Sequence, residues 1–237
     1  MAPSNGKIVI VTGVSGTIGN AVATSLVNQG YSVVGLSRGA PTNCSDNFIH
    51  IPTDIRDEAS INQAIDEISD MPDVLYALIN AAGSMTSMAA LVMPNAAMTE
   101  MVQTNILGTL MISRAVARQL IKHRNGRIIF FGSMASILNP MGDATYSITK
   151  HATVGMADAL GMELAKAGIT CNSVIVTATK TGMSEKVNRE ALEEIIHTLP
   201  TRSWTTLSEI TRVVEFFLDE ASSGITCQKI CFGGLRY

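Results

Sequence analysis

Short runs of apolar, often β-branched residues alternate along this chain with longer segments in which apolar residues recur every three or four positions. The short runs have the length of strands covered on both faces, and the longer segments have the period of helices. We expect strands at residues 8–11, 32–36, 48–52, 74–79, 127–131, 169–176 and 229–232. This alternation predicts an α/β fold: one doubly wound, parallel, seven-stranded sheet with helices on both faces.

Helices are expected at residues 21–27, 58–68, 95–123, 146–165 and 209–218. The apolar stripe of the 95–123 segment carries an asparagine, Asn105, and a buried amide costs free energy unless its hydrogen bonds are satisfied. Asn105 is therefore either a satisfied core group or part of a site. The chain has no internal repeat, low-complexity tract or linker, so we predict a single domain over residues 1–237.

Composition narrows the classes of protein that fit this pattern. Hydrophobic residues make up 46% of the chain, charged residues only 16%, and the net charge is −3 with scattered lysines and arginines, which argues against nucleic acid. No segment is apolar enough to span a membrane, and residues 1–6 are too polar and short for a signal peptide, so we expect a cytoplasmic protein. The four cysteines and four histidines follow no metal-binding spacing, so no metal is expected.

Residues 12–19 form a glycine-rich turn between the first strand and the first helix. A turn in that position suits a dinucleotide, because helix N-terminal amides bind phosphates and glycines allow the backbone to approach them. The candidate contacts are Gly13, Ser15, Gly16, Thr17, Ile18 and Gly19.

The second strand ends in Ser37 and Arg38, where a site for NAD would place an acidic residue that binds the ribose hydroxyls. A serine and an arginine suit a 2′-phosphate instead, so we predict NADP (NADPH) as the cofactor. The alternative is that Arg38 is simply a solvated side chain at the start of a loop.

Tyr146 and Lys150 are four residues apart, which puts both side chains on one face of a helix. A fixed ammonium group favours phenolate, and this brings a tyrosine towards use as a proton donor near neutral pH. Taken alone, such a pair is more often a surface feature, so its meaning depends on the motifs around it.

Four motifs occur in order: TGxxGxxG after the first strand, NAAG after the fourth, Ser133 at the end of the fifth, and YSITK thirteen residues later. With them, the chain resembles the short-chain dehydrogenase/reductase family, which has a Rossmann-type fold. The resemblance implies that Tyr146 is the general acid or base and that Lys150 lowers its pKa and binds ribose. It also implies that Ser133 donates a hydrogen bond to the substrate oxygen and that Asn105 holds a water linking Lys150 to solvent.

The resemblance further implies the remaining cofactor contacts. These are Asp54 and Ile55 at the adenine, Asn80, Ala81, Ala82 and Gly83 beside the adenosine ribose, and Thr179 and Thr181 near the nicotinamide. The chain departs from the usual pattern at Thr17, where the family has a glycine, at Ala81, where it has an asparagine, and at Val176 and Thr177, where it has Pro-Gly. These departures affect cofactor binding more than the chemistry.

Within the family the chain looks most like the 3-oxoacyl-acyl carrier protein reductases, in which a basic residue at the position of Arg124 grips the carrier. We therefore expect reduction of a 3-oxoacyl thioester, carried by acyl carrier protein or CoA, in a homodimer or homotetramer paired through the Asn105 and Tyr146 helices. The alternatives are a specialised-metabolite, sugar or cyclic ketone or alcohol as the substrate, or a dinucleotide-binding sensor or scaffold without turnover. Residues 181–204 are expected to form a lid, and the pocket rim to include Met85, Met88, Met93, Met134, Leu138, Met141 and Met183.

Overall fold

The computed structural model describes residues 4–41, 47–182, 184 and 189–237. Its sheet consists of β1 Lys7–Thr12, β2 Ser32–Ser37, β3 Phe48–Pro52, β4 Val74–Asn80, β5 Gly126–Ser133, β6 Ile169–Val176 and β7 Lys229–Cys231. All neighbouring strands are parallel, in the order β3-β2-β1-β4-β5-β6-β7. The predicted parallel sheet of seven strands is confirmed, and β6 has the bounds that the sequence predicted.

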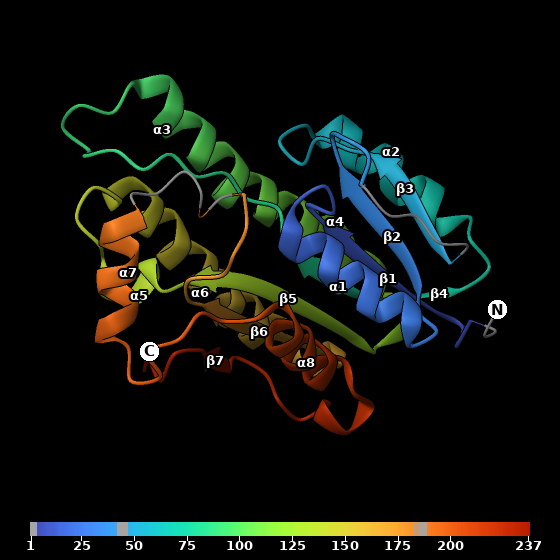
Figure 1. Ribbon diagram of the computed structural model, residues 1–237. Helices are drawn as coiled ribbons and strands as arrows, with labels where there is room; N and C mark the ends of the chain where they lie inside the picture. The colour runs from blue at the N-terminus through green and yellow to red at the C-terminus, as the bar shows by residue number, and fades with distance from the viewer. Residues whose placement is uncertain (1–3, 42–46, 183, 185–188) are drawn as a thin grey trace.

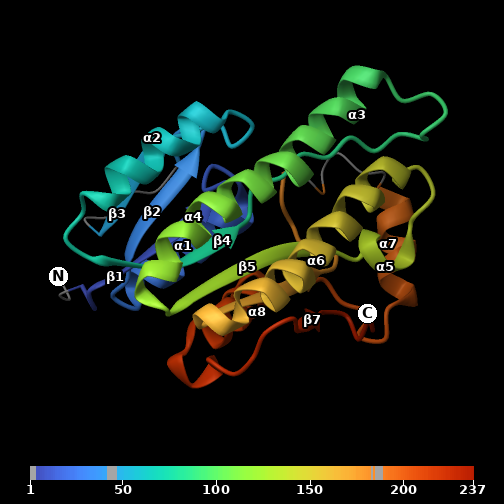
Figure 2. The same ribbon diagram turned by 180° about the vertical axis from the view of Figure 1, so that it is seen from behind.

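Helices cover both faces of this sheet (Figures 1 and 2). On one face lie α1 Thr17–Asn28 and α8 Leu207–Leu218; on the other lie α2 Glu58–Ser69, α4 Thr109–His123 and α6 Ala144–Leu164. The doubly wound architecture is therefore confirmed, in a single domain.

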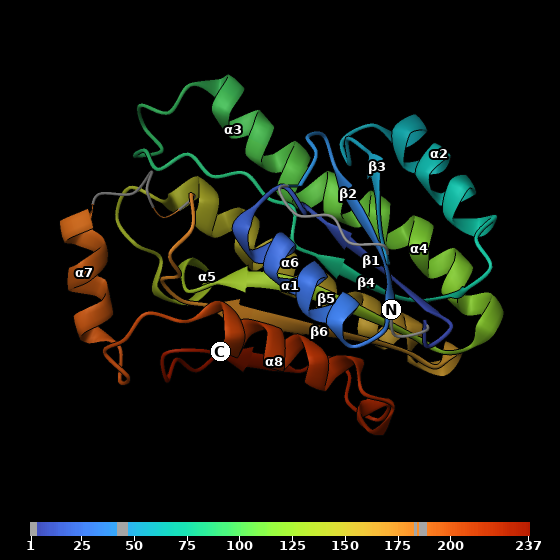
Figure 3. The same cartoon turned by 45° about the vertical axis from the view of Figure 1, so that its right-hand side comes forward.

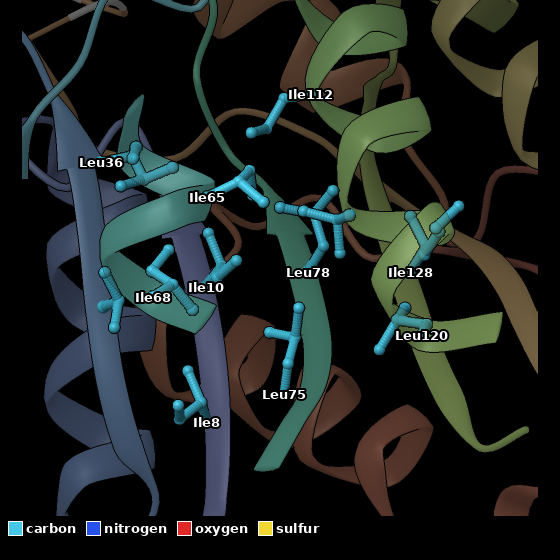
Figure 4. Close-up of a cluster of buried hydrophobic side chains, with 14 of the residues drawn as sticks. Ile8, Ile10, Leu36, Ile65, Ile68, Leu75, Leu78, Ile112, Leu120 and Ile128 are labelled. Atoms are coloured by element: carbon cyan, nitrogen blue, oxygen red, sulfur yellow. The ribbon is translucent and has the colours of Figure 1, made fainter. Parts of the chain in front are cut away.

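The sheet has a hydrophobic core on each face, and side chains that alternate along β1 contribute to both. Ile8 and Ile10 point to the face of α2 and α4, whereas Val9 and Val11 point to the face of α1 and α8, and all four are buried. Figure 4 shows Ile8 and Ile10 among the first of these groups. Since both faces of a central strand are covered by helices, an unbroken apolar run is what its sequence requires.

The helix expected at residues 95–123 is not uniform. It consists of α3 Asn95–Val102, a π-helical segment at Gln103–Gly108 and α4. At the end of that segment the helix passes close to the loop after β3, because a Cβ atom at Gly108 would lie 2.9 Å from the Ile55 carbonyl oxygen. A π segment adds a residue to a helical turn and is frequent at functional sites, and this one contains Asn105.

Two helices near the carboxyl end of β5 lay outside the prediction (Figure 3). The short α5 Ala135–Leu138 follows β5 directly, and α7 Arg189–Thr198 lies within the segment expected to be a lid. Short 3₁₀ turns at Ala165–Ala167 and Glu220–Ser222 complete the elements used below. Across the described ranges, no helix combines the length and apolarity needed to cross a bilayer.

Candidate active site

The sheet changes direction of winding between β1 and β4, and a cleft of about 910 Å³ opens at the carboxyl ends of the strands there. Ligands of open α/β sheets bind at this kind of topological switch point. The cleft is lined by most of the residues that the sequence nominated for the cofactor: Gly13, Ser15, Gly16, Thr17, Ile18, Gly19, Ser37, Arg38, Asp54, Ile55, Ala81, Ala82, Gly83 and Thr181.

The glycine turn is held against the end of β4. Gly13 has φ of +71°, and a Cβ atom there would lie 2.7 Å from both the N and the Cα of Ala82. Beside it, Thr12 Oγ1 accepts hydrogen bonds from the amides of Ala81 (3.1 Å) and Ala82 (3.0 Å). A Cβ atom at Gly19 would lie 2.4 Å from the Gly13 carbonyl oxygen, so α1 starts as close to the turn as glycine permits.

The N-terminus of α1 is prepared for an anion. Its N-cap, Gly16, offers no side-chain cap, and its first turn contains no acidic residue. By contrast, α2 is capped by Asp57, and α8 has a full capping box formed by Thr206 and Glu209. The first-turn amides of α1 therefore lack a side-chain acceptor, as those of α3 and α6 also do, and what suits α1 to a phosphate is that its N-terminus lines the cleft. Thr17, the departure from the family glycine, is the exposed first residue of α1.

The far side of the cleft carries two arginines. Arg56 binds Asp54 through both carboxylate oxygens, with Nε 2.9 Å from Oδ1 and Nη2 2.5 Å from Oδ2, and this pairing lowers the pKa of Asp54 to about 2. Arg38 is exposed and, within the described residues, takes part in no ion pair. Arg56, which sequence reasoning missed, is thus neutralised by Asp54, whereas the charge of Arg38 is available to a ligand.

Asn80 is placed differently from its three successors. Its side chain is buried and donates from Nδ2 to Ser113 Oγ of α4 at 3.0 Å, whereas Ala81, Ala82 and Gly83 line the cleft. The Asn80 amide therefore faces the helix layer, and the wall beside the cofactor is made by small residues.

A second hollow of about 140 Å³ adjoins the cleft and shares Ala81, Gly83 and Thr181 with it. Ser133, Tyr146, Lys150 and Thr179 line this hollow. Ser133 closes β5, while Tyr146 and Lys150 lie on α6, and the Ser133 hydroxyl is near enough to Tyr146 to lower the pKa of the phenol. The hydroxyls expected to act on one oxygen are therefore brought together at an open hollow.

Burial sets the acidity of the two α6 groups. It raises the pKa of Tyr146 to about 12, against the lowering effect of the Ser133 hydrogen bond, and the nearby Asp143 carboxylate raises it further. Burial also lowers the pKa of Lys150 to about 8. Lys150 Nζ lies 5.8 Å from the centre of the Tyr146 ring and donates to the Phe131 carbonyl at 2.9 Å. In this arrangement desolvation outweighs the expected effect of the lysine, and Tyr146 is held as a protonated phenol.

Asn105 lies beside Lys150. A Cβ atom at Gly83 would be 3.4 Å from Asn105 Oδ1 and 3.8 Å from Lys150 Nζ. Asn105 Oδ1 accepts from the Ser84 amide at 2.8 Å, and Nδ2 donates to the Ser84 carbonyl (2.8 Å) and to Thr149 Oγ1 (3.0 Å). Because protein groups already satisfy the hydrogen bonds of the Asn105 side-chain amide, the Asn105 main-chain carbonyl would be the group that holds a water.

The rim of the hollow is less rich in methionine than the sequence indicated. Met85 and Met134 line it, and Met93 is buried in a small cluster with Met101, Ala135 and Tyr146. Met88, Leu138 and Met141 are exposed, and Met183 lies outside the described residues. The sequence reasoning missed Asp143, a buried carboxylate in the wall, and Leu192 and Ile195 of α7.

Arg124 lies at the opposite end of β5 from Ser133. It is the exposed C-cap of α4, and its Nη2 donates to the Lys166 carbonyl at 2.9 Å. Eight residues of strand separate the two ends by about 25 Å. Arg124 is therefore remote from the mouth of this cleft.

Comparisons with known proteins agree with this geometry. The family model described as short chain dehydrogenase matches residues 7–192. The 3-oxoacyl-[acyl-carrier-protein] reductase FabG of Salmonella typhimurium is 30% identical, covering 98% of each chain. Two solved structures share the fold at 24% identity: an aldohexose dehydrogenase from Thermoplasma acidophilum (TM-score 0.87, covering 97% of this chain and 93% of that one) and an actinorhodin polyketide ketoreductase with NADPH (TM-score 0.88, covering 100% of both).

Proposed function

This chain belongs to the short chain dehydrogenase family and is an oxidoreductase acting on CH–OH or C=O groups, and on that premise we propose that it reduces a ketone to a secondary alcohol with NADPH. The observation that carries the proposal is that the Ser133 and Tyr146 side chains line the same hollow, which adjoins the dinucleotide cleft. A nicotinamide dinucleotide, when bound, supplies the hydride that such a reduction needs.

The proposed chemistry assigns the two hydroxyls to the substrate oxygen. Negative charge develops on a carbonyl oxygen as its carbon is reduced, and donors aimed at that oxygen stabilise the charge. Ser133 would donate a hydrogen bond to it, and Tyr146 would deliver the proton. Tyr146 is protonated at neutral pH, as the acid role requires, but a pKa raised to about 12 makes it a weaker acid than a free phenol. It can still protonate the substrate oxygen, because an alkoxide is a stronger base than a phenolate.

Lys150 and Asn105 would support that proton transfer. Lys150, whose pKa is about 8, can gain and lose a proton near neutral pH, and it lies on the same helix face as Tyr146. We assign Lys150 to the ribose and to reprotonation of Tyr146, and the Asn105 main chain to a water on that path. Thr179 and Thr181 would border the nicotinamide end of the cofactor.

The choice of NADPH over NADH rests on Arg38. It is exposed, lines the cleft after β2 and, among the described side chains, has no ion-pair partner, whereas Arg56 is already paired with Asp54. A phosphate offers such a guanidinium charge-assisted hydrogen bonds. The Ser37 hydroxyl supports this assignment less, because it donates to the Gly39 carbonyl at 2.6 Å.

The leading substrate class is a 3-oxoacyl thioester carried by acyl carrier protein or CoA. It is supported by the 30% identity to a 3-oxoacyl reductase over nearly the whole chain. If Arg124 grips a carrier, its distance from Ser133 requires that the carrier serve the cleft of another copy in a homodimer or homotetramer. Pairing through α4 and α6 would cover the exposed apolar side chains there, which include Leu110, Ile121, Ile148 and Met162.

The second candidate is a specialised-metabolite, sugar or cyclic ketone, favoured by the carboxylate of Asp143 in the wall of the hollow. NADPH consumption with acetoacetyl thioesters, cyclic ketones and ketoses tests both candidates. Turnover of a thioester supports the 3-oxoacyl thioester as the substrate class. Turnover of other ketones, with none of any thioester, rejects it. NADPH binding without turnover across the whole panel would instead favour a sensor or scaffold.

A further inference from the structure

Asp143 is the residue immediately before α6, three positions before Tyr146. Its carboxylate is near enough to the phenol to raise the pKa of Tyr146. Its side chain lines the same hollow as Ser133 and Tyr146, and the residue is only 7% exposed. A charged group in this position is close to where a bound ketone would react.

Within the described part of the chain, this carboxylate has few partners. It accepts one hydrogen bond, from Ser87 Oγ to Oδ1 at 2.6 Å, and it forms no ion pair. It also provides no side-chain cap to α6. An ionised carboxylate can accept about four hydrogen bonds, and burying one that is largely unsatisfied costs free energy. Asp143 therefore has unused acceptor capacity.

The surroundings of Asp143 indicate what could use that capacity. Among the described residues that line the hollow it is the only carboxylate, and Met85, Met134, Pro140 and Leu192 make much of the remaining wall. A purely hydrocarbon group placed here would bury the carboxylate without replacing its bonds to water, which is costly. A substrate group that donates a hydrogen bond would avoid that cost.

We propose that Asp143 is a specificity-determining residue, whose carboxylate accepts a hydrogen bond from a hydroxyl or amide N–H of the substrate. The inference rests on the proposed function, because it concerns the same site. A hydroxylated ketone carries such a donor beside the ketone, whereas the amide N–H of a thioester arm lies several bonds away and reaches Asp143 only if the arm turns back along the wall of the hollow.

Two matched pairs of ketones test the proposal and separate the two sources of the donor. Hydroxyacetone and butanone differ by a hydroxyl in place of a methyl group. The N-acetylcysteamine thioester of acetoacetate and its acetoxyethyl analogue differ by an amide N–H in place of an ester oxygen. Wild-type protein with NADPH should prefer the donor-bearing member of at least one pair, in kcat/KM, by about tenfold to 100-fold.

Asp143→Leu should bring that preference close to one while leaving the donor-free ketone at least as good a substrate. Asp143→Asn, which keeps the shape and one acceptor oxygen, should give an intermediate preference. Ser87→Ala is the matched structural control: it removes the bond that ties the carboxylate to the loop between β4 and α3, so it should lower the thermal stability and retain the preference. If Asp143→Leu leaves the preference within each pair unchanged, the proposal is overturned. If kcat/KM also falls equally for both members of each pair, the residue is only structural.

Binding of the same four compounds to the NADP⁺-loaded protein, followed by saturation-transfer NMR, gives a measurement without turnover, because the oxidised cofactor has no hydride to transfer. Wild-type protein should bind the donor-bearing member of a pair more tightly than the donor-free member. The Asp143→Leu protein should bind the two members equally. If wild-type protein binds with this preference but reduces none of the four, the proposed reductase activity fails and the assignment of Asp143 stands. If it reduces ketones without any preference within either pair, the assignment fails and the activity stands.

Discussion

The cofactor cleft and the hollow beside Tyr146 share Ala81, Gly83 and Thr181, yet they are built from different material. The cleft is shaped by main chain: a glycine turn with φ of +71° at Gly13, the uncapped start of α1, and the small residues after β4. The hollow is shaped by side chains from separate elements, namely the ends of β5 and β6, the start of α6, and α7. Backbone geometry leaves a readable motif in a sequence, whereas a wall assembled from distant side chains does not.

The electrostatics of the two regions differ in the same way. Charges at the cleft are exposed or paired, as in Arg38 and the Asp54–Arg56 pair. Charges at the hollow are buried, and burial shifts the pKa of Tyr146 up to about 12 and that of Lys150 down to about 8. In the proposed function the cleft would bind the cofactor and the hollow would carry out proton transfer, so mutations in the two regions should have different effects.

Among the effects on stability and cofactor binding, the largest is expected for Gly13→Ala, which disrupts the main-chain construction of the cleft. The new methyl group would overlap Ala82 at 2.7 Å in addition to the strain of a positive φ. We expect a loss of about 3 kcal/mol or more in the free energy of unfolding, or a rise of about 100-fold in the NADPH Kd where the fold survives. Chemical denaturation and fluorescence titration with NADPH measure the two quantities.

Gly6→Ala is the matched control, since Gly6 has φ of +78° but nothing within 4 Å of the added Cβ atom. It should cost only about 1 kcal/mol, from backbone strain alone, and leave the Kd unchanged. Equal effects of the two substitutions would show that the contact between the turn and β4 does not matter.

Arg38→Asp should come next in size and change binding at the cleft without changing chemistry at the hollow. The preference for NADP over NAD should fall by about tenfold to 100-fold, because a charge-assisted hydrogen bond to the 2′-phosphate is lost. The ratio of kcat/KM values for the two cofactors measures this effect. Arg212→Asp makes the same charge change at an exposed site on α8 and should leave the ratio unaltered.

The smallest effect concerns the buried charge of Lys150. Since its folded-state pKa of about 8 is below the ordinary value of 10.5, the unfolded chain binds more protons between those values, and stability should rise with pH across that range. The expected gain between about pH 7 and about pH 9.5 is on the order of 2 kcal/mol. Above pH 10 the raised pKa of Tyr146 acts in the opposite direction, because the unfolded chain loses that proton first.

Lys150→Met keeps the length of the side chain and removes its charge, so this part of the pH dependence should disappear. Guanidinium denaturation of both proteins at the two pH values checks the prediction. An identical rise in stability in the variant would show that other groups cause it.

The elements, and the side chains that the fold brings together at the hollow, were largely predictable from the sequence, for a physical reason. Buried parallel strands are β-branched runs, so β6 could be delimited correctly from residues 169–176 alone. The fifth strand was expected to start at Arg127 and starts at Gly126, but the sequence did not show that Arg127 is only 1% exposed and lies over the Tyr76 ring. A charged residue in a central strand gives no signal of this kind until its partner is known.

Other features depend on contacts that the sequence does not encode locally. The π segment around Asn105 continues an apolar stripe of helical period, and its extra residue is accompanied by a close approach to Ile55. The α7 helix could have been found from the spacing of Leu192, Ile195 and Ile196. The burial of Asp143 could not, because an aspartate before a helix is usually a solvated cap.

The proton-donor role of Tyr146 is the central claim, and single-turnover reduction by Tyr146→Phe tests it most directly. Protein preloaded with NADPH would be mixed with a ketone that wild-type protein reduces, and the loss of reduced nicotinamide followed, with Tyr237→Phe as the control for a distant phenol. We predict a rate about 10²-fold to 10⁴-fold lower in Tyr146→Phe with the NADPH Kd nearly unchanged, and wild-type behaviour in the control. A Tyr146→Phe protein that reduces the ketone at the wild-type rate would contradict the account.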